Sequence, residues 1–344
     1  MNHFAKICTH FLCLFLSHQW LNAQVKKIGV VGFTVKNADA SADFYHKVLG
    51  FKKISDEEFY GDDYDKLQGI FGLRMRIVQM QLGDETIELT QYLTAGGRDI
   101  PADMHSNDLY FEHIAIVVSD MGKAYKHLRK YMVTHVSTGP QTIPQSNTAA
   151  AGVKAFYFHD PDMHDLELIF FPAGKGQPKW QDTNGKLFLG IDHTAISISN
   201  TDSSLHFYRD ILGLEAKGES WNAGMEQAHL NNIEGASLHI TGLRCNSGVG
   251  IEFLQYLYPG PGKPFPPNSM ANDIWHWQTS LLVDDAENLY RKLKELHYTF
   301  ISKGMVSLAS RGYLIKSFVV RDPDGHALLI MERHYDNLPV SIRY

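Results

Sequence analysis

The chain has 344 residues, of which 44% are hydrophobic and 20% charged, a composition typical of a globular protein with a sizeable core. Its formal net charge is −6, and the basic residues are scattered along the sequence. Binding to nucleic acid or to an anionic membrane surface requires clustered Lys and Arg, so both classes of function are disfavoured.

Residues 1–23 have the pattern of a secretory signal peptide. Lys6 precedes the apolar run "ICTHFLCLFL", and "LNAQ" closes the segment, which predicts cleavage near Ala23–Gln24. The run is short for a membrane span; a membrane anchor or a misassigned start are the alternatives. We therefore expect an exported protein, periplasmic or secreted, with no membrane attachment after cleavage. Its mature chain would keep only Cys245 and have no internal disulfide.

A strand, a turn and a helix recur four times along the rest of the chain. The run "VGFTVKNADASADFYHKVLGFKKI" matches "TAISISNTDSSLHFYRDILGLEAK", and each contains Leu-Gly, a typical helix end. Weaker copies begin at Glu112 ("EHIAIVVSDMGKAYKHLRKY") and at Trp277 ("WQTSLLVDDAENLYRKLKEL"). Further strand-like runs follow each copy. The sequence therefore predicts four βαβββ modules.

These modules predict an α+β fold with two curved mixed sheets. The helices of a module cover one face of its sheet, so the other face must meet a second module. In sequence order the modules form two domain-length halves, 24–174 and 187–335, separated by a polar linker (175–186) and followed by a tail (336–344). The segment "YPGPGKPFPP" (258–267) is too rich in proline to be a central strand.

Aligning the modules on their turns reveals a repeated pair of positions. The first-strand positions are Val30, His113, His193 and Gln278, and the last-strand positions are Glu88, Glu167, Glu252 and Leu329. Only the second and third modules carry both a His and a Glu. Two imidazoles and two carboxylates suit a divalent transition metal such as Zn, Ni, Fe, Co or Mn, whereas Ca or Mg would not need imidazole.

Each of these residues also has an ordinary interpretation, as a core or surface His or as a Glu on a solvated edge strand. The matched recurrence in two related modules favours the metal site. Small residues share the strand face of His193, so we expect this face to border a cleft, with Ile196 and Ile198 packed on the helix. Histidines near the Asp-Pro-Asp turns are predicted to be surface residues: His159, His164 and His326.

The sequence resembles the vicinal oxygen chelate superfamily, which includes glyoxalase I, methylmalonyl-CoA epimerase, extradiol dioxygenases and fosfomycin- or bleomycin-resistance proteins. The motifs "DHTAISISNTDSSLHFYRDILGLE", "FEHIAIVVSDM", "TIELTQYL" and "DPDMHDLELI" carry the resemblance, which covers nearly all of the chain after residue 23. In glyoxalase-like members, each of two paired modules gives the metal one first-strand His or Gln and one last-strand Glu. The resemblance therefore implies a complete site if the second module pairs with the third, with the ligands His113, Glu167, His193 and Glu252. Pairing consecutive modules would leave each site one ligand short.

The resemblance also implies a metal-dependent lyase or isomerase, in which the metal stabilises an enediolate formed from a small, vicinally oxygenated substrate. Glu167 holds the position of the glyoxalase base, with Glu252 as the alternative or partner. Export argues against glutathione or coenzyme A as part of the substrate. The rival functions are a non-haem iron dioxygenase, disfavoured by Gln278 and Leu329, and a non-catalytic binding protein. We expect a monomer or a homodimer.

Overall fold

The computed structural model describes residues 24–310 and 313–335. The predicted signal peptide and tail lie outside these residues. In the described part of the chain, no helix is long and apolar enough to cross a membrane.

Each of the four predicted modules is present, with its elements in the predicted order. The first contains β1 (Val25–Thr34), α1 (Ala38–Leu49), β2 (Lys52–Tyr60), α2 (Asp62–Gln68), β3 (Arg74–Leu82) and β4 (Glu85–Tyr92). The second contains β5 (Glu112–Val118), α3 (Met121–Lys130), β6 (Gln141–Thr142), β7 (Lys154–His159) and β8 (Asp165–Phe170). The 3-10 helix η1 (Pro178–Gln181) lies in the linker between the halves.

The third and fourth modules repeat this order. The third contains β9 (Phe188–Ile198), α4 (Thr201–Leu205), the π-helical turn η2 (His206–Ile211), β10 (Glu215–Asn222), α5 (Met225–Asn231), β11 (Ser237–Arg244) and β12 (Gly250–Tyr258). The fourth contains β13 (Trp277–Val283), α6 (Ala286–Glu295), β14 (Val306–Ser310), β15 (Tyr313–Arg321) and β16 (Ala327–Tyr335). The short helices α2 and α5 are additions that the sequence pattern did not predict.

An Asn or Asp side chain begins the first helix of every module. The side-chain oxygen accepts hydrogen bonds from backbone N–H groups of the first helical turn, which would otherwise have no partner. The four capping residues are Asn37, Asp120, Asn200 and Asp285. Gly50 ends α1 in the left-handed conformation, with φ of 76°, as its Leu-Gly signal predicts. The polar turn in each repeat is therefore the start signal of a helix.

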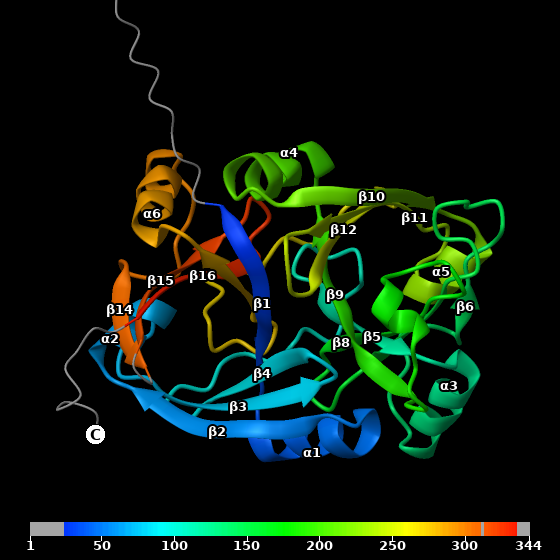
Figure 1. Ribbon diagram of the computed structural model, residues 1–344, viewed down its shortest axis with the longest axis horizontal. Coiled ribbons are helices and arrows are strands. Elements are labelled where there is room, and N and C mark those ends of the chain that lie inside the picture. The colour runs from blue at the N-terminus through cyan, green and yellow to red at the C-terminus, as the bar shows by residue number, and fades with distance from the viewer. Residues whose placement is uncertain (1–23, 311–312, 336–344) are drawn as a thin grey trace, which may run out of the picture.

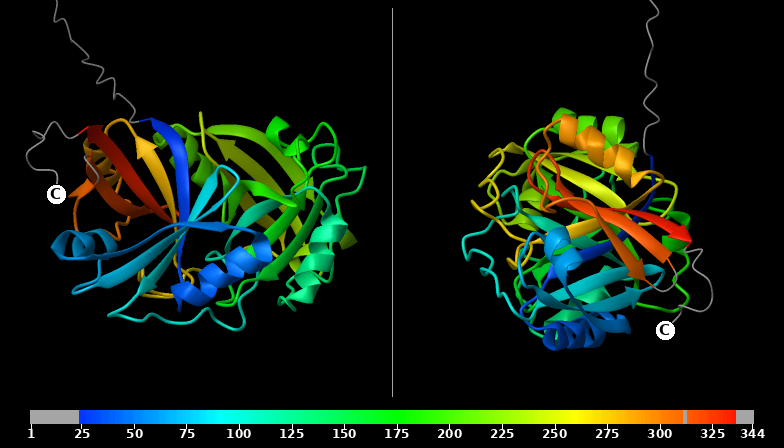
Figure 2. Two further views of the ribbon diagram at one scale, coloured as in Figure 1. Left: turned by 60° about the horizontal axis from the view of Figure 1, so that its bottom comes forward. Right: turned by 90° about the vertical axis from the view of Figure 1, so that its left-hand side faces the viewer.

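The strands form two eight-stranded mixed sheets. The outer-module sheet joins the first and fourth modules in the order β14-β15-β16-β13-β1-β4-β3-β2. The inner-module sheet joins the third and second modules in the order β10-β11-β12-β9-β5-β8-β7-β6. Figure 1 shows the two sheets side by side, with β1 and β9 near the middle of the molecule, and the left view of Figure 2 shows them from another side. This arrangement confirms the predicted pairing of the second module with the third. The halves 24–174 and 187–335 stay a prediction, and each sheet takes one module from each half.

One continuous hydrophobic core joins the helices to one face of both sheets. It includes Ile114 and Ile116 of β5, Ile196 and Ile198 of β9, and Leu128 of α3. The predicted orientation of the β9 isoleucines is thus confirmed. The opposite face of the inner-module sheet is left to smaller clusters and to polar side chains, and this face carries the site described below.

The sequence predicted that the histidines near the Asp-Pro-Asp turns lie at the surface. The structure places them differently. His164 and His326 are buried, and each Nδ1 contacts the buried carboxylate four residues earlier, that of Asp160 at 2.9 Å and that of Asp322 at 3.0 Å. Each carboxylate also accepts a hydrogen bond from a buried tyrosine hydroxyl of another module: Tyr45 of α1 donates to Asp160, and Tyr208 of η2 donates to Asp322. The prediction was wrong because these turns bind helices instead of facing solvent. His159 is partly buried.

Candidate metal centre

The four predicted ligands come from the four central strands of the inner-module sheet. Strands β5 and β9 are antiparallel, and His113 and His193 lie in diagonal register, His113 opposite Ala195 and His193 opposite Ala115. The same two alanines lie beside the carboxylates, because Ala115 pairs with Glu167 of β8 and Ala195 pairs with Glu252 of β12. The paired modules therefore bring both histidines and both glutamates to one face of the sheet.

Three of the four side chains form a tight buried group. His113, Glu167 and His193 each offer one ligand atom, and these atoms all lie within 4.8 Å of one another. Glu167 Oε2 is 3.2 Å from His113 Nε2 and 3.6 Å from His193 Nε2. Glu252 joins the group from the other side, with its Oε2 3.5 Å from His193 Nε2. The predicted ligands are thus close together, with Glu167 at the centre.

The hydrogen bonding of the histidines fits a metal site. His193 Nε2 is buried without a hydrogen-bond partner, and it points at two carboxylates. A buried polar atom without a partner is costly, and a bound divalent ion would satisfy it. The donor set of imidazole nitrogens and carboxylate oxygens is one that divalent transition metals favour.

A β-bulge places a third carboxylate behind His193. Ala115 pairs with His193 while the next residue, Ile116, pairs with Ile191, so Asp192 is the extra residue. Asp192 Oδ2 lies 3.0 Å from His193 Nδ1. An acceptor at Nδ1 fixes the tautomer that leaves Nε2 free for a metal, an arrangement common around metal-bound histidines.

Asp192 is itself held by groups from two other parts of the chain. Arg244 of β11 donates from Nη2 to Asp192 Oδ2 at 2.5 Å. Trp180 Nε1 donates to Oδ1 at 2.6 Å, and Gln177 Nε2 donates to the same oxygen at 3.0 Å. Trp180 and Gln177 belong to the segment around η1, so the linker supplies part of the support of the centre. Sequence reasoning missed all four residues.

Neighbouring charges outweigh the effect of burial on the pKa values of His193 and Glu167. Burial alone would lower the pKa of His193, but the carboxylates of Glu252 and Asp192 outweigh it and raise that pKa to about 10. Burial raises the pKa of Glu167, but the neighbouring rings of His113 and His193 lower it by more, so its pKa falls below the usual value. Without a metal the His193 ring therefore holds a proton, which a bound metal ion would replace.

A cavity of about 340 Å³ opens on one side of the centre. Its lining includes His193, Glu252 and Arg244 together with Lys217 and Ser220 of β10. Glu167 does not line this cavity. Its size lies within the roughly 300–1,000 Å³ of small-molecule sites. Glu252 is therefore the glutamate of the group that borders this space, with 27% of its side chain exposed.

The equivalent positions of the outer-module sheet do not form such a group. Glu88 Oε1 accepts a hydrogen bond from Gln79 Nε2 at 2.8 Å, and burial raises the pKa of Glu88. Val30 and Leu329 provide no ligand atoms. Within residues 24–310 and 313–335, no second group of three His, Cys, Asp or Glu side chains has metal-binding spacing.

Two βαβββ modules share each curved mixed sheet, and in the inner-module sheet two His and two Glu side chains meet where the modules join. A model of the Glyoxalase/Bleomycin resistance protein/Dioxygenase superfamily matches residues 27–168 and again residues 190–330. The chain therefore belongs to this superfamily, whose glyoxalase members use divalent metals and whose enzymes bind small-molecule substrates.

Two similar proteins illustrate the range of the family. Glyoxalase I from Zea mays is similar in structure, with a TM-score of 0.58 and 16% identity over 89% of this chain and 92% of the maize chain. The uncharacterized protein YwbC of Bacillus subtilis (strain 168) is 26% identical over 143 residues, which are 42% of this chain and 97% of YwbC. At this identity the maize structure supports the fold alone.

Proposed function

We propose that the protein is a divalent-metal-dependent lyase or isomerase of the glyoxalase type, acting on a small molecule with two adjacent oxygens. The observation that supports this proposal best is the convergence of His113, Glu167, His193 and Glu252 beside a cavity of about 340 Å³. These four residues would hold the ion. When bound, a divalent ion supplies Lewis-acid stabilisation of negative charge that develops on substrate oxygens.

Glu252 is the proposed general base. It borders the cavity, whereas Glu167 lies between the two histidines and does not reach the cavity lining. A base must approach the proton that it removes, so geometry favours Glu252 over Glu167, which the resemblance alone favoured. Glu252 would take a proton from the hydroxyl-bearing carbon next to a carbonyl group and return it to the former carbonyl carbon, while the hydroxyl proton passes to the former carbonyl oxygen.

Solvent exchange tests this function without knowledge of the natural substrate. The purified protein, loaded with Zn²⁺, Ni²⁺, Co²⁺ or Mn²⁺, is incubated in D₂O with a panel of small α-hydroxyaldehydes and α-hydroxyketones, and deuterium incorporation is followed by NMR. We expect incorporation at the carbon next to the carbonyl, and its loss in Glu252→Gln. Absence of incorporation with every metal, or full activity of Glu252→Gln, would reject the proposal. Glu226→Gln, which changes a glutamate that does not line the metal-site cavity, is the matched control.

A non-haem iron dioxygenase is the second candidate. The tight group of His113, Glu167 and His193 contains two histidines and one carboxylate, the set typical of non-haem Fe(II) oxygenases. This candidate requires oxygen consumption with Fe(II), measured with an oxygen electrode on a panel of catechols. Oxygen uptake that depends on Fe(II) and on both histidines would favour it over the lyase or isomerase.

We also propose that the protein is exported. The proposal rests on the signal-peptide pattern of residues 1–23. Cell fractionation with an antibody against the chain tests it. A full-length protein found with the cytosolic fraction would overturn export.

A further inference from the structure

A second cavity, of about 460 Å³, is lined by His159 and Asp165, which lie on the same face of the inner-module sheet as Glu167. We call it the lateral cavity. It is larger than the metal-site cavity, and none of the four candidate metal ligands lines it. Its walls come from the segment after β1, the connection between β4 and β5, the ends of β7 and β8, and the end of α5.

The two cavities occupy related positions in the repeated modules. Asp165 begins β8 beside His113, just as Gly250 begins β12 beside His193. His159 pairs with Asp165 across the sheet, and Arg244 lies against Gly250 so closely that a Cβ atom there would be 2.7 Å from Cζ of Arg244. The third module therefore presents an arginine over a glycine, and the second presents a histidine beside a carboxyl group.

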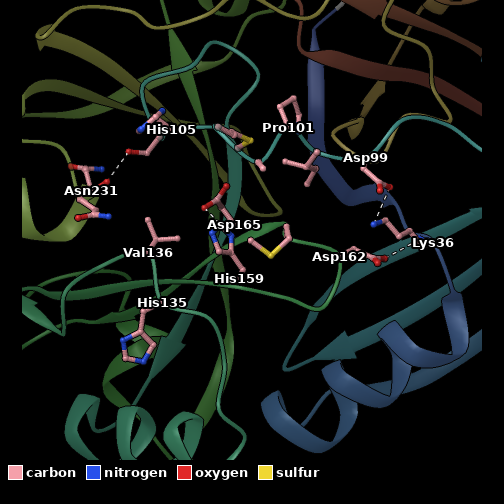
Figure 3. A pocket seen from close by; sticks show the side chains of 16 residues that line it. Lys36, Asp99, Pro101, His105, His135, Val136, His159, Asp162, Asp165 and Asn231 are labelled. Carbon is pink, nitrogen blue, oxygen red and sulfur yellow. Dashed lines mark hydrogen bonds and ion pairs between the residues drawn. The ribbon is translucent and has the colours of Figure 1, made fainter.

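The lateral cavity contains polar groups that the protein leaves unsatisfied. Asp165 Oδ2 and His159 Nδ1 are buried without a hydrogen-bond partner, and the buried side chain of Asn231 lies against Tyr256. Asp165 is 3% exposed and Asn231 is 2% exposed. Figure 3 shows Asp165 and His159 at the centre of the cavity, Asn231 to one side, and Lys36 with Asp162 to the other. Buried polar groups without partners are rare in folded proteins and are usually satisfied by ordered water or by a bound molecule.

Several charged side chains line the lateral cavity, and some of them pair with one another. Lys36 Nζ pairs with Asp99 at 2.9 Å, and His159 Nδ1 lies 3.5 Å from Asp165 Oδ1. Asp162 accepts a hydrogen bond from the backbone N–H of Lys36. The lining has three carboxyl groups, those of Asp99, Asp162 and Asp165, and only one lysine, so the cavity does not favour an anion. The remaining lining is apolar and includes Pro101, Met104 and Val136.

We propose that the lateral cavity is a second ligand site, which takes a small uncharged molecule with hydroxyl or amide groups. Such groups both donate and accept hydrogen bonds, so they satisfy a carboxyl oxygen and an imidazole nitrogen together. The apolar lining contacts the carbon skeleton of the ligand. A volume of about 460 Å³ accommodates a molecule of this size.

Ligand-observed NMR on the full-length protein tests the site. The probes are glycerol, D-glucose, myo-inositol and propionamide, with acetate and methylammonium as charged comparators. At least one neutral probe is expected to bind at one site per chain, and its affinity is expected to fall about tenfold or more in His159→Leu, because a polar contact is lost. Ala102→Trp, a change at an exposed residue of the rim, is the second variant and is expected to block binding by filling the entrance.

Two controls separate this site from the metal centre. His206→Leu alters an exposed histidine outside the cavity and is expected to leave probe binding unchanged. Glu252→Gln is also expected to leave it unchanged, so failure of the proposed catalytic function does not affect this test. The proposal is overturned if no neutral probe binds, if binding survives both His159→Leu and Ala102→Trp, if binding requires Glu252, or if only the charged comparators bind.

Discussion

Asp192 offers the sharpest test of how the metal centre is supported. Its Oδ2 accepts from His193 and Arg244, and its Oδ1 accepts from Trp180 and Gln177. An Asn side chain has the same shape but one acceptor oxygen. If that oxygen stays with Trp180 and Gln177, the amide NH₂ faces the donors of His193 and Arg244, and the His193 ring loses the acceptor that fixes its tautomer.

We expect Asp192→Asn to weaken metal binding about 10- to 100-fold, the usual effect of losing such a partner. This range corresponds to about 1.4–2.8 kcal/mol. The measurement is a competition titration of Zn²⁺ or Co²⁺ against a chromophoric chelator, with circular dichroism to confirm folding. Asp182→Asn, an exposed change in the same linker, is the matched control. A dissociation constant for Asp192→Asn within twofold of the unmodified protein would refute the reasoning.

Two further predictions concern the buried groups of the second Asp-Pro-Asp turn. Tyr208→Phe removes the hydroxyl that donates to Asp322 at 3.1 Å, and should lower the free energy of unfolding by about 1–3 kcal/mol in urea, while Tyr60→Phe, at an exposed residue, should change little. An equal loss of unfolding free energy in Tyr208→Phe and Tyr60→Phe would contradict this prediction. For His326, burial alone lowers the pKa, but Asp322 outweighs it and raises the pKa above the unfolded value of about 6.5. Its contribution is therefore fully present below that value and is lost as the pH rises through the folded pKa. Urea unfolding should show the stability gap between the unmodified protein and His326→Gln narrowing with rising pH, and a widening gap would oppose the assignment.

The sequence predicted the repeat, the α+β fold and the pairing of the modules, because these depend on patterns that recur. Only a pairing of the second and third modules gives a complete set of two histidines and two glutamates, and the register of β5 with β9 confirms that pairing. The turn residues of the repeats were equally informative, since each one caps a helix.

The residues that hold His193 in place could not be predicted in the same way. Neighbouring strand residues normally point to opposite faces, so regular alternation would turn Asp192 away from His193. The bulge at Asp192 removes this alternation, and strand patterns do not reveal a bulge. Trp180 and Gln177 reach Asp192 from a linker whose polar composition suggested only a connection between the halves.

The burial of His164 and His326 was missed for a related reason. Asp-Pro-Asp turns usually lie at the surface. Here the aspartates accept hydrogen bonds from Tyr45 and Tyr208, which lie on helices distant in sequence, and the histidines are enclosed with them. Contacts of this kind depend on the packing of whole modules, not on local sequence.

The metal content of the purified protein tests the central claim most directly. Inductively coupled plasma mass spectrometry on the unmodified protein, His113→Ala, His193→Ala and the exposed control His206→Ala compares the contribution of each ring. One divalent ion per chain is expected in the unmodified protein and the control, with loss of that ion in both ligand variants, because the second and third modules share one centre. Loss in only one variant, or retention of a full equivalent in both, would contradict a shared centre.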